Sequence, residues 1–427
     1  MLVASCSLAG HSDPVFATDT SSLELSGASC TRHFESLSRK HGLRPPVTAF
    51  AERAAMSNRL NTTNRKCEAV VYVHSSRVFV HNAQTQPDLS KLHRRALLDN
   101  LRSIAKALPA TATFVAGLHS ADLGSCTTSH TGLKELPSVV SSVAGDESLP
   151  PLLLPIHGNQ VLRYLKQRAK RPVARKQNTS AACVWHGSKT GHAKYQSAHA
   201  SRSTCAASET DRQCVVKLAA GALSGQLEAS FDKSAAIFEA PCILAVDGNS
   251  YAGLFKDTLL QGSLALRVGG HVHGGRPAGS ASPYEWYEPL LVDGTHYLRT
   301  EIDGLQNTLA ALPPSADLKR IAAKGRNAAL ALFDERAFAC YNLLAANELA
   351  ARQPATLAAA AAAHPSSWTE VRLGISLPAG ASKAQASRMR NATISSRRTA
   401  TTSTTRRARP LGSDATTTRG RQPLLRG

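Results

Sequence analysis

The stretch that decides the fold is 242-CILAVDGNSYAGLFKDTLLQGSLALRV-268. It opens with five apolar residues that end at Asp247-Gly248, continues with a helical pattern over 251–260, and closes with a second apolar run over 262–268. Strand, helix and strand in this order are typical of a parallel sheet that helices cover on both faces. The stretch therefore predicts an α/β fold.

The same alternation extends outward from this stretch in both directions. Before it, two β-branched runs at 69–73 and 78–80 have the pattern of a hairpin, and the apolar face of 89–108 predicts a helix that Pro109 ends. Two series of this kind predict parallel sheets in two Rossmann-like lobes with a cleft between them and a boundary near 150–180. The other expected strands are 113–118, 152–155 and 181–185, and the other expected helices are 211–220, 317–333 and 335–350.

The two ends of the chain differ in composition from its centre. Residues 1–64 are rich in Ser and Thr without sustained periodicity, so we expect a disordered or processing segment. From 351 the chain is Ala-rich and then rich in Ser, Thr and Arg, and we expect a disordered tail over 351–427. The globular domain is accordingly predicted over 65–350, with a polar surface loop at about 192–210.

The net charge is unevenly distributed along the chain. The formal charge is +20, and the tail from Ala351 holds 13 Lys and Arg against only Glu370 and Asp414. More than half of the excess therefore lies in the last fifth of the chain, and the rest of the chain carries only about +9. Nucleic-acid binding through the basic tail stays open as one alternative, although aromatic residues for stacking on bases are lacking there.

The nine cysteines include no CxxC pair and no cluster with zinc spacing. We interpret them as buried or incidental thiols and leave open disulfides formed in an oxidising lumen. Sequons for N-glycosylation begin at Asn61, Asn178 and Asn391. We expect neither a membrane span nor a signal peptide, because no apolar run approaches ~20 residues and Met1–Gly10 lacks a basic region.

Three segments carry chemistry. The strand that ends in Trp185-His186-Gly187-Ser188-Lys189-Thr190-Gly191 presents backbone N–H groups and hydroxyls, which suit an anionic or polyol ligand. The second turn, 247–251, adds carboxylate, amide and hydroxyl groups for ribose, uracil or sugar hydroxyls. The third segment, 283–291, is rich in aromatic residues, and alone it indicates packing more than function.

In this order and spacing the three segments, with Gly294-x-His296-Tyr297 and a final Ile-Ala-x-x-Gly-Arg helix, resemble the CAP10 family of glycosyltransferases (glycosyltransferase family 90). The resemblance covers roughly residues 66–350. It implies a two-lobed GT-B fold and an inverting transfer of glucose or xylose from a UDP-sugar to a hydroxyl of a protein or glycan. It further implies a monomer of the ER or Golgi lumen that needs no metal and no cofactor besides the UDP-sugar.

The resemblance also assigns roles to residues of this chain. Inversion needs one general base to deprotonate the acceptor hydroxyl, and the matching segment 113–123 offers Asp122. Arg212 matches an Arg expected near the diphosphate, where a guanidinium donates two charge-assisted hydrogen bonds. The expected UDP-sugar site consists of His186, Gly187, Ser188, Thr190, Gly191, Arg212, Asp247, Gly248, Asn249, Ser250, Tyr251 and Lys256.

Two positions depart from the family pattern. His186 stands where the family usually has Arg before Gly-Ser, and Leu254 stands where it usually has Arg two residues before Lys256. A lost guanidinium weakens the stabilisation of a diphosphate by several kcal/mol unless another cation replaces it, and Lys256 is the candidate replacement. A catalytically degenerate relative that binds a nucleotide sugar or a partner is therefore a second alternative.

Overall fold

The computed structural model describes most of the chain between Leu25 and Val371. The described residues are 25–48, 50, 69–81, 98, 101–102, 104–118, 125–127, 135–140, 142–143, 152–153, 183–189, 205–206, 209–232, 240–248, 252–269, 284–353 and 355–371.

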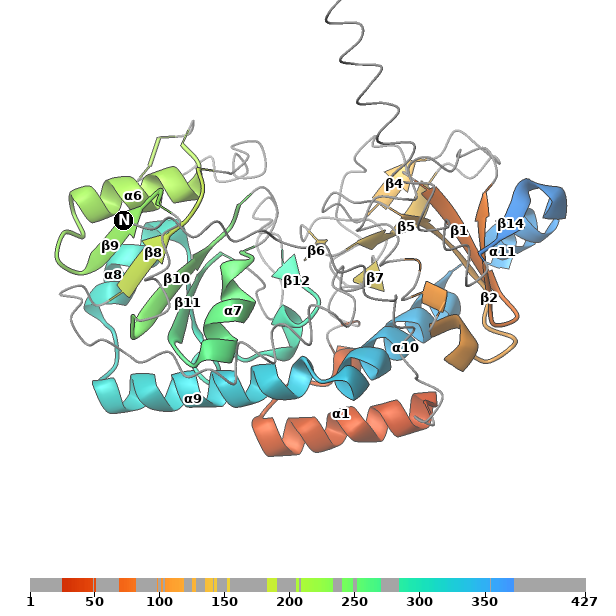
Figure 1. Ribbon diagram of the computed structural model, residues 1–427, viewed down its shortest axis with the longest axis horizontal. Coiled ribbons are helices and arrows are strands. Elements are labelled where there is room, and N and C mark those ends of the chain that lie inside the picture. Colours follow the sequence, from red (N-terminus) through yellow and green to blue (C-terminus); the bar gives the residue numbers. More distant parts are fainter. Residues whose placement is uncertain are drawn as a thin grey trace, which may run out of the picture. The chain divides into compact units, whose positions relative to one another are not determined.

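A five-stranded parallel sheet positions the predicted site residues that follow β8 and β10 in the described part of the chain. Its strands are β8 (Cys183–His186), β9 (Leu227–Ser230), β10 (Cys242–Val246), β11 (Leu264–Val268) and β13 (Leu298–Thr300), in the spatial order β13-β11-β10-β8-β9 (Figure 1). Taken in chain order this is 2-1-3-4-5, so connections leave β8 and β10 toward opposite edges of the sheet. The predicted α/β class is confirmed, and the switch point of the sheet lies between β8 and β10.

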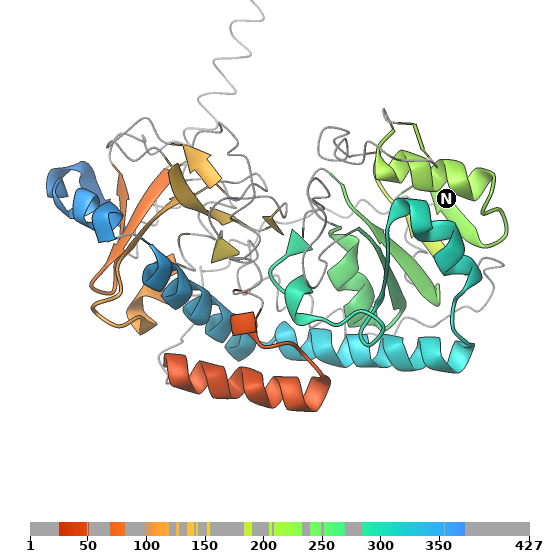
Figure 2. The same cartoon turned by 180° about the vertical axis from the view of Figure 1, so that it is seen from behind.

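Helices cover both faces of this sheet (Figures 1 and 2). The face that carries Leu264, Leu266 and Val268 of β11 packs against α6 (Asp211–Ala220) and α8 (Leu305–Ala310). The opposite face packs against α7, and α9 contacts both α7 and β11. The bounds of these two helices are Leu254–Gln261 for α7 and Ser315–Leu332 for α9. The strands are apolar on both sides because both faces are covered.

The sheet in the first half of the chain is mixed rather than parallel, which corrects one expectation. Its order is β14-β2-β1-β3-β5-β4, with β7 beside β5; β3, β5 and β7 are parallel, whereas the other pairs are antiparallel. The hairpin explains the difference, since a two-residue connection joins only antiparallel strands. The strands are β1 (Ala69–His74), β2 (Arg77–His81), β3 (Phe114–Leu118), β4 (Ser125–Thr127), β5 (Glu135–Val140), β7 (Leu152–Leu153) and β14 (Trp368–Glu370).

Two further strands, β6 (Ser142–Val143) and β12 (Tyr284–Glu285), form a separate antiparallel pair. On one face of the mixed sheet, Val71, Val73 and Phe114 share an apolar cluster with the helical residues Leu101 and Ile104. Leu101, Ile104, Ala105 and Leu108 are all buried, as the predicted helical face requires.

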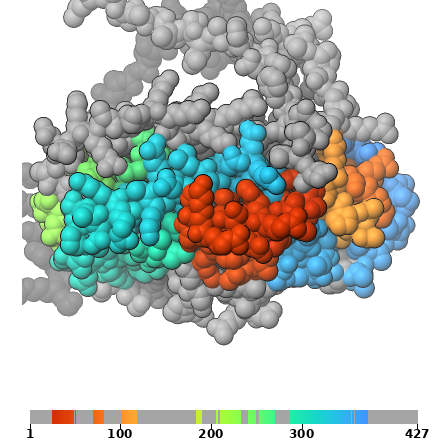
Figure 3. Space-filling model, turned by 90° about the horizontal axis from the view of Figure 1, so that it is seen from below, coloured from red at the N-terminus to blue at the C-terminus, as the bar shows by residue number. Residues whose placement is uncertain are grey.

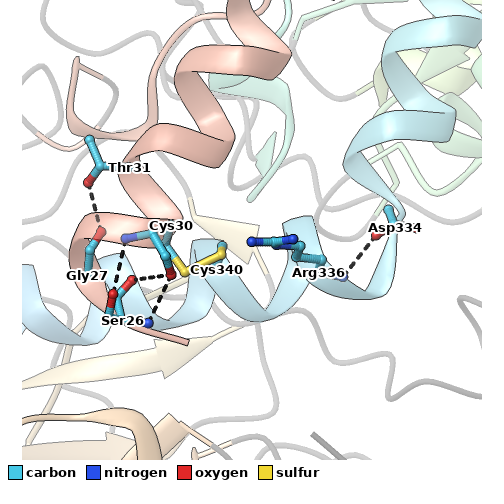
Figure 4. The surroundings of a disulfide bond; sticks show 8 residues. Ser26, Gly27, Cys30, Thr31, Asp334, Arg336 and Cys340 are labelled. Carbon is cyan, nitrogen blue, oxygen red and sulfur yellow. Dashed lines mark hydrogen bonds between the residues drawn. A yellow bond between two sulfur atoms is a disulfide. The ribbon is translucent and has the colours of Figure 1, made fainter. Parts of the chain in front are cut away.

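The N-terminal region contains a helix, which corrects the expectation of a disordered or processing segment over 1–64. Within it, Gly27–His41 forms helix α1, which Ser26 caps and which buries Cys30 and Phe34. A disulfide joins Cys30 to Cys340 of helix α10 (Glu335–Arg352), with 4.9 Å between their Cα atoms (Figure 4). The Nε2 atom of His296 donates to the carbonyl oxygen of His41 at 2.7 Å. Helix α1 contacts α9 and α10 along the face that Figure 3 displays.

The C-terminal limit of the domain also differs from the expected one, because helices and a strand continue beyond residue 350. Helix α10 (Glu335–Arg352) is followed by α11 (Ala355–Ala362), and β14 then pairs with β2 as an edge strand of the mixed sheet. Trp368 is buried, lies 5.4 Å from the ring of Tyr72, and donates from Nε1 to the carbonyl oxygen of Ala361 at 3.0 Å. The described domain therefore runs from 25 to 371 instead of from 65 to 350.

Among the residues that the structure describes, six cysteines form disulfides, which corrects their interpretation as incidental thiols. Besides Cys30–Cys340, Cys183 of β8 is bonded to Cys242 of β10, and Cys205 is bonded to Cys214 of α6. The bond between Cys183 and Cys242 joins β8 and β10 at their amino ends, opposite the carboxyl ends where the candidate site lies. The third ties the segment before α6 to the helix itself. Among the described helices none is both long and apolar enough to cross a membrane.

The turn between β1 and β2 offers a test of the hairpin. Ser75 and Ser76 have φ of 48° and 62°, the left-handed conformation that both central residues of a type I′ turn need and that Asn-Gly adopts best. We predict that Ser75→Asn combined with Ser76→Gly raises the free energy of unfolding by about 1 kcal/mol. Urea denaturation measures the change, with Ser75→Ala combined with Ser76→Ala as the control. Equal stability of the two double variants would contradict this turn geometry.

The disulfide between α1 and α10 offers a second test. We predict that peptide mapping without reductant recovers Cys30 and Cys340 in one linked peptide. Replacing both by Ser should lower the free energy of unfolding by about 2–5 kcal/mol, because the bond closes a very long loop in the unfolded chain. Free thiols at both positions in the purified oxidised protein would show that α1 is not held in this way.

Candidate functional site

The candidate site lies where β8 and β10 end. Arg212, in the first turn of α6, donates from Nη1 to the carbonyl oxygen of Ser188 at 3.2 Å and to its hydroxyl at 3.1 Å. Its Nη2 donates to the carbonyl oxygen of Val246 at 3.3 Å. One guanidinium thus joins the carboxyl ends of the two strands at the switch point.

The start of α6 is fixed by its own sequence. The hydroxyl of Thr210 accepts from the N–H of Gln213 at 3.2 Å, and the side chain of Gln213 accepts from the N–H of Thr210 at 2.9 Å. This capping box sets the entry of the helix, and Cys214 is held one turn further on by its disulfide. The helix therefore presents Arg212 to the sheet edge from a fixed position.

Two glycines make the close approach possible. A Cβ atom on Gly248 would lie 2.7 Å from Nη2 of Arg212, and a Cβ atom on Gly187 would lie 2.7 Å from the ring of Trp185. Trp185 in turn packs under the guanidinium, whose Cζ lies 5.8 Å from the ring centroid. Any larger residue in either turn would displace Trp185 or Arg212, so the glycines of both turns have a steric role here.

Asp247 lies directly after β10 and is buried, with only 3% of its surface exposed. Its Oδ1 atom is 2.6 Å from Nη2 of Arg267, which is itself completely buried in β11. Nε of Arg267 donates to Oε2 of Glu288 at 3.1 Å. The Oδ2 atom of Asp247 has no hydrogen-bond partner among the described residues, so it is available to accept a hydrogen bond from a ligand hydroxyl.

Burial dominates the electrostatics of this carboxylate. It raises the pKa of Asp247 to about 7, although Arg267 opposes the change; Glu288 and Asp211 add to it. Burial also lowers the pKa of Arg212, against the attraction of Asp247. For Arg267, burial alone would lower the pKa, but its ion pairs with Asp247 and Glu288 raise it. Arg267 is consequently the cation on which the charge of Asp247 depends.

Lys256 belongs to a second buried group and not to the Arg212 contact. Its Nζ lies 2.9 Å from Oε1 of Glu285, and the hydroxyl of Tyr287 donates to Oε2 of the same carboxylate at 2.9 Å. Burial raises the pKa of Glu285, whereas Lys256 lowers it. The expectation that Lys256 compensates for Leu254 at a diphosphate needs correction, because its charge is already neutralised within the core.

His186 is bound to β9. Its Nδ1 atom lies 2.7 Å from the hydroxyl of Ser230, and its Nε2 atom lies 3.4 Å from Oε1 of Glu228. The three side chains form an acid, imidazole and hydroxyl series, but Glu228 is exposed and the two ring nitrogens have the opposite roles from those in serine hydrolases. We interpret the series as the support of the β9 turn.

The other predicted residues fall into two sets. Leu254 packs against the apolar clusters of the sheet, so an arginine there would lose buried contacts. The motif residues Trp286, Tyr287 and Tyr297 are core residues. The predicted residues that lie outside the described part of the chain are Asp122, Thr190, Gly191, Asn249, Ser250 and Tyr251.

Sequence reasoning missed Arg267, Glu285 and Glu288 as partners of the site. The available signal was Arg267 itself, which interrupts the otherwise apolar run of β11. A charge in a fully buried parallel strand needs carboxylate partners nearby. Asp247 and Glu288 meet that need by direct contact. The N–H of Glu285 donates to Glu288 at 2.9 Å and so holds the second carboxylate in place.

Comparison with known protein families finds no match for this chain, and no curated protein has significant sequence similarity to it. In the part of the chain that the structure describes, no group of three or more His, Cys, Asp or Glu residues is placed to hold a metal ion.

The raised pKa of Asp247 predicts a dependence of stability on pH. Between about 3.9, its value in the unfolded chain, and about 7 the folded protein holds this proton more tightly than the unfolded chain does. Stability is therefore highest below pH 4 for this group and falls as the pH rises to 7. Between pH 5 and pH 8 the wild type should therefore lose on the order of a few kcal/mol of its free energy of unfolding through this group. We predict that Asp247→Asn removes this loss.

Urea denaturation at both pH values measures the effect, with Asp317→Asn, an exposed carboxylate of α9, as the control. An Asp247→Asn protein that loses as much stability as the wild type between pH 5 and pH 8 would rule out this carboxylate as the origin.

Proposed function

We propose that this protein is a glycosyltransferase that binds a UDP-sugar at the carboxyl ends of β8 and β10. The observation that carries the proposal is the contact of Arg212 with both strand ends beside Gly248. A cation, two glycine turns and a helix start at the switch point of a doubly wound sheet are suited to a phosphate ligand. In this proposal the mixed sheet belongs to the acceptor lobe of a GT-B arrangement.

The proposed chemistry is an inverting displacement. Asp122 takes the proton of the acceptor hydroxyl, the oxygen attacks the anomeric carbon, and the bond from that carbon to the diphosphate breaks. The UDP that leaves carries the charge, which Arg212 stabilises through charge-assisted hydrogen bonds. Asp247 is suited to hold a hydroxyl of the ribose or the sugar through its Oδ2 atom, which lacks a partner among the described residues.

The disulfides support an oxidising compartment such as the ER or Golgi lumen, where such bonds persist. The loss of a cation at Leu254 and the internal pairing of Lys256 favour the second candidate, a relative that binds a UDP-sugar without transferring it. Both candidates use the same binding site and differ only in turnover.

A screen of UDP-sugars for hydrolysis and transfer tests the proposal. We predict that one UDP-sugar is turned over, that Asp122→Asn lowers turnover by about 10²- to 10⁴-fold with little change in donor affinity, and that Arg212→Ala weakens donor binding by at least tenfold. The control is Arg326→Ala, since Arg326 also donates to a backbone carbonyl, that of Leu260 at 3.2 Å, but from α9.

Each result separates the candidates. Binding without turnover of any donor would establish the degenerate relative. Absence of UDP-sugar binding in the folded wild type would rule out both the active transferase and the degenerate relative. Equal losses in Arg212→Ala and Arg326→Ala would mean that Arg212 only supports the fold.

A further inference from the structure

Phe231 is an exposed aromatic residue at the edge of the sheet where the proposed donor site lies. It follows directly after β9, and 37% of its surface is exposed. The other large apolar side chains that are exposed in the described part of the chain are Val47 and Leu330. Phe231 differs from both because it stands at the carboxyl end of a strand next to β8.

The backbone around Phe231 is held in place. The hydroxyl of Ser230 accepts from the N–H of Asp232 at 3.2 Å and lies 2.7 Å from Nδ1 of His186. The ring of Phe231 stands perpendicular to that of Trp185, at 89° with 5.9 Å between centroids. The side chain is thus exposed to solvent while its position is fixed by β8.

Two cations accompany these rings. Nζ of Lys189, an exposed residue of the β8 turn, lies 6.0 Å from the centroid of Phe231, and Cζ of Arg212 lies 5.8 Å from that of Trp185. The series Lys189, Phe231, Trp185 and Arg212 therefore places an aromatic face between two positive groups. At 6.0 Å the Lys189 contact is at the outer limit of a cation–π interaction, so the flexible amine can turn to an anion at little cost.

We propose that Phe231 is a stacking platform for the planar base of a nucleotide whose phosphates contact Arg212 and Lys189. The inference deepens the proposed function, on which it rests for the position of the phosphates. Aromatic side chains bind bases through their faces, and positive groups beside them bind the phosphate backbone. A nucleotide carries both chemistries in one molecule, whereas an apolar partner surface would match Phe231 alone and not the exposed amine of Lys189 beside it.

The test measures binding of UDP, ADP, uridine and inorganic pyrophosphate to the wild type and to three variants by calorimetry. Phe231→Ala should weaken binding of the nucleoside diphosphate about tenfold and leave pyrophosphate binding unchanged. Phe231→Tyr should retain the affinity, since it keeps the aromatic face. Leu330→Ala is the matched control, because Leu330 is also 37% exposed but lies on α9.

The outcomes separate this inference from the proposed function. If UDP binds equally well to the wild type and to Phe231→Ala, the platform is wrong and the donor site stands. If ADP binds but UDP does not, and Phe231→Ala weakens ADP binding, the stacking platform is supported and the UDP-sugar function is ruled out. If pyrophosphate binding falls as much as nucleotide binding, or no nucleoside diphosphate binds the folded protein, the platform is overturned.

Discussion

The arrangement of the parallel sheet depends on one buried cation. Arg267 has no exposed surface, and a guanidinium in that position is tolerated only with carboxylates in contact. Asp247 supplies one from the turn after β10, and Glu288 supplies the other from the segment after β12. The charge of Arg267 therefore fixes the turn that opens the candidate site and connects it to the aromatic segment at 284–288.

The properties of the site follow from this constraint. Because Asp247 is held in the interior by Arg267, its carboxylate is desolvated and its pKa rises to about 7. Gly248 then leaves the space that Arg212 occupies, and the guanidinium reaches Ser188 and the end of β10. A ligand at this edge would meet groups that are already positioned, which lowers the entropic cost of binding.

The sequence predicted those elements that form because of a local pattern, and it missed those that form because of contacts between residues far apart in the chain. In the second half, strands β8, β10 and β11 and helices α6, α7, α9 and α10 were predicted close to their ends, because apolar runs and periodicity are local. The short strands β9 and β13 and helix α8 were not predicted. Helix α1 was missed because its order comes from Cys340 and His296, both far along the chain. Strand β14 was missed for the same reason, because Trp368 is buried only where β14 pairs with β2 and its ring contacts Tyr72, both far away in the sequence. In the site, Ser188, Arg212 and Gly248 were predicted together, whereas the partners of Arg267 required the fold.

The same distinction explains why a family pattern can mislead at single positions. Lys256 fits the pattern of a cation near a diphosphate, but in the fold Glu285 and Tyr287 neutralise it. His186 stands where the pattern has Arg, and its contact with Ser230 supports the turn that carries Phe231. A residue's chemistry is thus set by the group it faces, and at this edge the described contacts place positive charge on Arg212 and Lys189 beside two aromatic rings. That combination, more than any single motif residue, is the reason we propose a nucleotide as the ligand of this site.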